Sequence, residues 1–161
     1  MTDTLLSLAE LAVAITGFAA IVVVFRRRES GRWERFGANS FNGMLFHSMT
    51  ALVFCLLPVA LEALELRSTT LWRIVAGMLG GVLLGHAPVV AVVLSKGRSL
   101  AARALVLAAE LPQAGILLAV AAGAFAPQAA GLFAAALCLQ ILQAAALFLA
   151  LSFVRQEDME D

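Results

Sequence analysis

Two ionisable residues, His86 and Glu110, lie inside very apolar stretches of this sequence, and each stands two positions before a proline, Pro88 or Pro112. A charge-capable side chain is costly in a helix of membrane length. A proline adds to that cost, because it removes a backbone N–H and leaves the carbonyl four residues earlier without its helical partner. Histidine changes charge near neutral pH. The two motifs, within the segment 77–113, therefore predict a site, and they leave its activity open.

Other polar side chains are expected at the same depth as these two. Depth can be counted from the basic residues that flank each apolar stretch, at about 1.5 Å per residue. By this count five side chains from four stretches lie roughly 10 to 18 Å deep, namely His47, His86, Glu110, Gln113 and Gln143. Polar groups at one depth can satisfy one another inside a helical bundle. Glu10 and Gln140 are expected farther out, where they would extend the same route.

Three hypotheses account for this polar layer. In the first, His47, His86 and Glu110 line a route for protons or ions. In the second, the same three residues bind a metal as two imidazoles and a carboxylate, a set that leaves coordination positions open. In the third, the layer fixes the register of the helices, and the protein acts by binding partners in the membrane. The identity of any cofactor stays open.

The composition indicates an integral membrane protein of the all-α class. The chain has 161 residues, of which 62% are hydrophobic and 14% charged, and its mean hydropathy is +0.96. About 20 apolar residues cross a hydrocarbon core of about 30 Å. We expect one transmembrane domain over 1–161, with five spans at about 4–25, 39–64, 71–95, 104–125 and 129–154. The first is expected to be a retained helix, because it lacks the basic start and the cleavage site of a signal peptide.

The basic residues near the ends of the spans predict the orientation. With the N-terminus outside, the inner side would hold Arg26, Arg27, Arg28, Arg32, Arg35, Lys96, Arg98, Arg103 and Arg155. The outer side would hold only Arg67 and Arg73. We therefore expect a cytoplasmic C-terminus. Arg73 is expected to pair with Glu62 or Glu65 across a short turn, or to extend toward the headgroups.

The segment 26–38 is expected to be a basic loop at the membrane surface. Arginines interleaved with an aromatic residue are typical of contacts with anionic lipid headgroups, and the residues expected to make them are Arg26, Arg27, Arg28, Arg32, Trp33 and Arg35. Nucleic-acid binding is not expected, because the basic patch is short and no foldable region surrounds it. No signature of a classical enzyme is present, because the sequence has no nucleotide-binding glycine loop and no extramembrane region large enough for a substrate domain; a metal-dependent enzyme within the membrane stays an alternative.

Small residues recur every four positions in two of the expected spans. The two series are Gly77, Gly81, Gly85 and Gly115, Ala119, Gly123. This spacing lets helix backbones approach closely in a membrane, within one chain or between chains. Because five helices are few for a transporter, we expect a homo-oligomer with any pore formed between its subunits.

Three stretches carry a resemblance to known sequences. They read GFAAIVVVFRRR, followed by Trp33, then LVFCLLPVALEALEL and LWRIVAG. The pattern resembles a group of small multi-span bacterial membrane proteins known mainly as hypothetical proteins. The resemblance covers roughly the first half of the chain and implies a protein of the bacterial inner membrane, without an activity or a site. Our leading hypothesis is a channel or small transporter for protons or ions; the alternatives are a membrane scaffold or regulatory subunit, or a metal-binding membrane protein.

Overall fold

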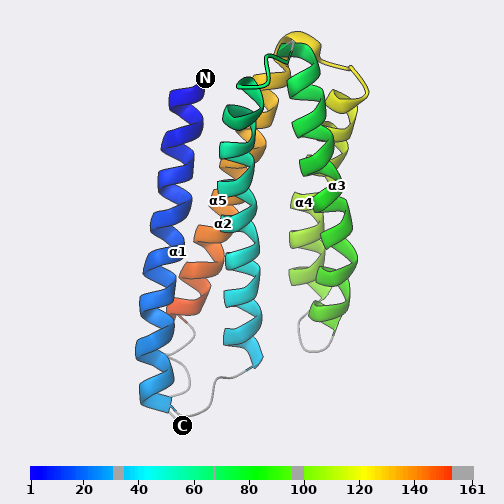
Figure 1. The fold of residues 1–161 in the computed structure, drawn as a ribbon. Helices are drawn as coiled ribbons and strands as arrows, with labels where there is room; N and C mark the ends of the chain where they lie inside the picture. Colours follow the sequence, from blue (N-terminus) through cyan, green and yellow to red (C-terminus); the bar gives the residue numbers. More distant parts are fainter. Residues whose placement is uncertain (31–34, 67, 96–99, 154–161) are drawn as a thin grey trace. The chain divides into compact units, whose positions relative to one another are not determined.

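The computed structural model describes residues 1–30, 35–66, 68–95 and 100–153 (Figure 1). These residues form helices and turns and contain no strand. The helices are α1 (Thr2–Ser30), α2 (Arg35–Glu62), α3 (Ser68–Ser95), α4 (Leu100–Ala121) and α5 (Ala129–Phe153), with a short 3-10 helix η1 (Ala126–Gln128) before α5. The prediction of an all-α fold is therefore confirmed.

Four of the helices contain a stretch that is long and apolar enough to cross a membrane, judged by length and composition. The stretches are Thr2–Val22, Phe41–Glu62, Ser68–Val92 and Ala126–Leu149. In α4 the apolar stretch is shorter and comprises Leu107–Ala121. This length counts only the residues of α4 whose side chains the structure describes. Four of the five expected spans thus have the necessary length, and a crossing by α4 stays a prediction.

The basic segment after the first span differs from the expected loop. Helix α1 continues through Ser30, and α2 begins at Arg35, so Arg26, Arg27 and Arg28 belong to a helix. Arginine is a good helix former, and a helix that leaves the apolar region keeps its backbone hydrogen bonds in water. Arg32 and Trp33 lie outside the described residues. The side chains of the other arginines in this segment are also outside the described part, so the contacts with lipid headgroups stay a prediction.

Helix α4 ends at Ala121, four residues before the expected end of the span. The Gly123 N–H bonds to the Val120 carbonyl and the Ala124 N–H to the Ala119 carbonyl, both at 2.9 Å. This pair of bonds is the Schellman motif, which needs a left-handed residue after the helix. Gly123 supplies it with a φ of 102°, so a glycine that the spacing assigned to helix packing ends the helix instead.

The chain forms two compact units, and α2 and α5 contribute to both. Unit 1 comprises 1–56 and 137–161, and unit 2 comprises 57–136. In unit 1, α1, α2 and α5 meet in two small clusters, the first formed by Ala12, Ala51 and Ile141 and the second by Ala19, Met44 and Ala144. The residue numbers rise on α1 as they fall on α2, so these helices are antiparallel. Their alanines allow the close approach that helix association needs in an apolar solvent.

In unit 2, α3 and α4 pack side by side (Figure 1). The closest approach is at Gly80, where an added Cβ would lie 3.1 Å from Leu118 Cγ and 3.2 Å from the Ala114 carbonyl oxygen. Gly77 also faces α4, but Gly81, Gly85 and Gly115 have nothing within 4 Å of an added Cβ. Within this unit the backbone contact therefore uses Gly77 and Gly80, whereas three of the six predicted small-residue positions, Gly81, Gly85 and Gly115, face open space.

Candidate functional site

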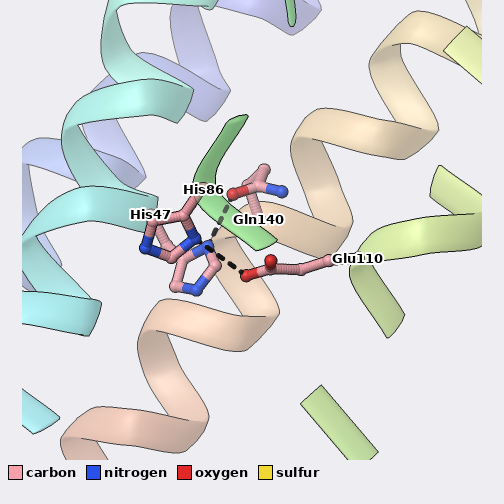
Figure 2. Close-up of polar contacts among 4 residues, drawn as sticks. All are labelled: His47, His86, Glu110 and Gln140. Atoms are coloured by element: carbon pink, nitrogen blue, oxygen red, sulfur yellow. Dashed lines mark hydrogen bonds and ion pairs between the residues drawn. The ribbon is translucent and has the colours of Figure 1, made fainter. Parts of the chain in front are cut away.

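His86 and Glu110 form a hydrogen-bonded pair between α3 and α4 in unit 2 (Figure 2). His86 Nδ1 lies 3.2 Å from Glu110 Oε1. The side chain of Glu110 is 0% exposed and that of His86 is 15% exposed. The antiparallel packing of α3 and α4 brings the two residues to the same level, as the count of depth predicted. Two of the predicted site residues are thus in direct contact.

This pair can hold a proton on either partner without a change of geometry. A neutral imidazole can donate its N–H to the carboxylate, an imidazolium can form an ion pair with it, and a protonated carboxyl can donate to the ring nitrogen. The separation of 3.2 Å suits a hydrogen bond along which a proton can move. Both helices continue through their internal prolines, Pro88 and Pro112.

A second buried pair, His47 and Gln140, joins α2 to α5 in unit 1 (Figure 2). His47 Nδ1 donates to Gln140 Oε1 at 2.7 Å, and the two residues are 3% and 0% exposed. The sequence analysis expected His47 in the inner layer and Gln140 farther out. Because the two side chains are in contact, they lie at one level, and the depth estimate was wrong for this pair.

The other predicted residues differ in their burial and in the contacts they make. Gln113 is buried, and its Nε2 donates to the Ala136 carbonyl of α5 at 2.8 Å, within unit 2. Gln143 is partly buried, and its Oε1 is a buried atom with no hydrogen-bond partner in the described residues. Glu10 is exposed on α1. Within unit 2 the predicted layer thus contains the pair of His86 with Glu110 and the contact of Gln113, and within unit 1 it contains the pair of His47 with Gln140.

Sequence reasoning missed two buried polar residues, Ser48 and Thr50, which are 1% and 8% exposed. The hydroxyl oxygen of Ser48 has no partner in the described residues. Met44, Ser48 and Ala51 follow the i, i+4, i+7 spacing of a single helix face. Met44 and Ala51 belong to the two apolar clusters of unit 1. A residue on the same helix face as these two is expected to be buried, so the spacing could have predicted the burial of Ser48.

A metal centre has limited support from the described residues. No group of three or more histidines, cysteines, aspartates or glutamates in them is placed to hold a metal ion. His86 and Glu110 offer two donor groups, whereas a catalytic zinc site has three protein ligands. His47, the third candidate, bonds to Gln140.

Comparisons of the chain with protein-family models, with curated proteins and with solved structures found no match. The assignment of a function therefore depends on the chain's own residues.

Proposed function

We propose that the chain is a multi-pass protein of the bacterial inner membrane that moves protons, or other cations coupled to them, across the bilayer. His86 and Glu110 are its protonation site. One observation carries the proposal: a fully buried carboxylate lies within hydrogen-bond distance of an imidazole, between two apolar helices. Four helices of membrane length and composition support the multi-pass architecture.

The cost of this pair argues for a function that needs it. Two ionisable groups removed from water lose several kcal/mol of solvation each, and apolar residues of similar volume often give a protein that is equally stable or more stable. Ionisable side chains in membrane helices accordingly mark ion paths and proton relays. Helix packing alone needs no titratable group at this place, because α3 and α4 already meet closely at Gly77 and Gly80.

The proposal includes the expected orientation and assembly. The excess of arginine and lysine on one side favours an outside N-terminus and a cytoplasmic C-terminus. Five helices are few for enclosing an ion path within one chain. The path is therefore proposed to form between several copies of the chain, in a homo-oligomer.

A second candidate function is a membrane scaffold or regulatory subunit that binds partner proteins. The contact from Gln113 to Ala136 and the pair of His47 with Gln140 favour it, because each ties two helices together and needs no proton transfer. In that case His86 and Glu110 would also serve only to fix the register of α3 and α4.

The deciding experiment measures proton and cation flux into liposomes that contain the purified protein. We expect flux above that of empty liposomes for the wild type and its loss in Glu110→Gln and His86→Ala. Thr50→Val is the matched control, because it removes a buried polar group that does not titrate and that lies outside the predicted polar layer. Circular dichroism and size-exclusion chromatography verify that each variant folds.

The possible results separate the two candidates. Flux that disappears with either member of the pair, but persists in the control, supports proton transfer at His86 and Glu110. Flux that persists in both variants shows that the pair is structural. A wild type without flux over a range of pH and voltage favours the scaffold function and directs the search to partner proteins.

A further inference from the structure

Arg73, in the first turns of α3, has its guanidinium held in one orientation by the end of α4. Its Nε donates to the carbonyl oxygen of Ala121 at 2.9 Å. Ala121 is the last residue of α4, where carbonyls have no partner within the helix and a positive charge is favoured by the helix dipole. The expected partners Glu62 and Glu65 form no ion pair with Arg73 in the described part of the chain, so the prediction of that pairing was wrong.

The two Nη groups of Arg73 are available for a second role, the binding of a ligand. A guanidinium has five N–H groups, and the bond to Ala121 uses the one on Nε. The guanidinium lies over Gly123, with its Cζ 3.6 Å and its Nη2 3.8 Å from the place that a Cβ would occupy there. The Nη groups make no hydrogen bond within the described residues and remain available to a ligand.

These groups border an open pocket of about 280 Å³ lined by Thr70, Arg73, Ile74 and Ala121. Thr70 contributes a hydroxyl, and Ile74 forms an apolar wall. Thr70, Arg73 and Ile74 follow the i, i+3, i+4 spacing of one helix face. Pockets that enclose a drug-sized molecule have about 300 to 1,000 Å³, so this open pocket suits a smaller group.

We propose that this pocket binds a phosphate group, and that the phosphate belongs to the headgroup of an anionic phospholipid. The planar N–H fork of arginine matches the oxygens of a phosphate, and charge-assisted hydrogen bonds of this kind are about twice as strong as neutral ones. The hydroxyl of Thr70 adds a further donor. The inference depends on the membrane insertion proposed above, but not on proton transfer by His86 and Glu110.

The position of the pocket along α3 favours a lipid as the source of the phosphate. The apolar stretch of α3 begins at Ser68, so Thr70 and Arg73 lie near its first end, at the level where headgroups meet the hydrocarbon core. From Ile74 the exposed face continues to Met78, and these residues are 40% and 49% exposed. This apolar track can accommodate the upper part of an acyl chain.

Native mass spectrometry of the detergent-purified protein, titrated with phosphatidylglycerol, tests the proposal. We expect one bound lipid in the wild type and a loss of affinity of about tenfold or more in Arg73→Gln. Ile74→Trp should weaken binding similarly, because it fills the pocket and keeps both the arginine and its bond to Ala121. Lys96→Gln, a matched loss of one positive charge, should leave the affinity unchanged.

A second titration with inorganic phosphate distinguishes the two possible sources of the phosphate. Displacement of the lipid by inorganic phosphate, with the same dependence on Arg73, supports the phosphate site and assigns it to a free ion. Equal lipid affinity in the wild type, Arg73→Gln and Ile74→Trp, all folded by circular dichroism, overturns the proposal. Because the flux experiment uses other residues, failure of either proposal leaves the other standing.

Discussion

The contact between α3 and α4 predicts opposite effects for the same substitution at two neighbouring glycines. Gly80 and Gly81 both lie in the middle of α3. At both positions alanine has a higher helix propensity than glycine. At Gly80 the new Cβ would lie 3.1 Å from Leu118 Cγ and 3.2 Å from both Leu117 Cβ and the carbonyl oxygen of Ala114. At Gly81 it would meet nothing within 4 Å. Only Gly80→Ala must therefore displace its neighbours.

The size of the difference follows from two opposing terms. Replacing glycine by alanine in a helix interior stabilises it by roughly 0.5 to 1 kcal/mol, and this gain applies to both positions. Overpacking of a close contact costs typically about 1 to 3 kcal/mol, and this cost applies to Gly80 alone. One of the three neighbours of Gly80 is a backbone oxygen, which cannot turn aside as a side chain can. We therefore expect Gly81→Ala to be slightly stabilising and Gly80→Ala to be less stable than it by about 1 to 3 kcal/mol.

The measurement is reversible unfolding of the purified protein in mixed micelles, followed by circular dichroism as the denaturing detergent increases. Each variant is compared with the wild type under identical conditions. A Gly80→Ala protein as stable as Gly81→Ala would refute the proposed contact face of α3. A larger loss at Gly81 would instead indicate that the series of glycines four residues apart forms the contact, as their spacing in the sequence suggested.

Two further predictions concern unit 1 and the orientation of the chain. His47→Ala should lower the free energy of unfolding by about 1 to 3 kcal/mol, because it leaves the fully buried Gln140 without its 2.7 Å hydrogen bond. The double variant His47→Leu with Gln140→Leu should recover most of that loss in the same unfolding assay. A loss in the double variant equal to the sum of the losses in His47→Leu and Gln140→Leu contradicts this explanation. For the orientation, a cysteine introduced as Gln128→Cys should react with an impermeant maleimide added outside intact cells. Protection until the cells are lysed would contradict the expected topology, in which the turn between α4 and α5 lies outside.

The sequence predicted that His86 and Glu110 lie at one depth, because both were counted from one short loop, but it left open whether their side chains touch. Glu110 was counted forward from Arg103 and His86 backward from Lys96, so an error in the position of that loop shifts both residues together. His47 was counted from Ala38 and Gln140 from the far end of the chain. The count for His47 assumed that the second span begins near residue 39. Helix α2 begins at Arg35 instead, so that starting position was wrong. Depth is therefore reliable between two helices that share a loop and unreliable between helices that do not.

The faces of the helices could not be predicted in the same way, because hydrophobicity does not mark an interior in a chain this apolar. Leu79 is fully buried and its neighbour Met78 is 49% exposed, although both are large and apolar. Such a helix has no polar side opposite its packed side, and lipid is as apolar as leucine. The polar residues are more informative, because His47, Ser48, Thr50, Glu110, Gln113 and Gln140 are all buried. In this chain the inward face of a helix is thus better read from its few polar side chains than from its many apolar ones.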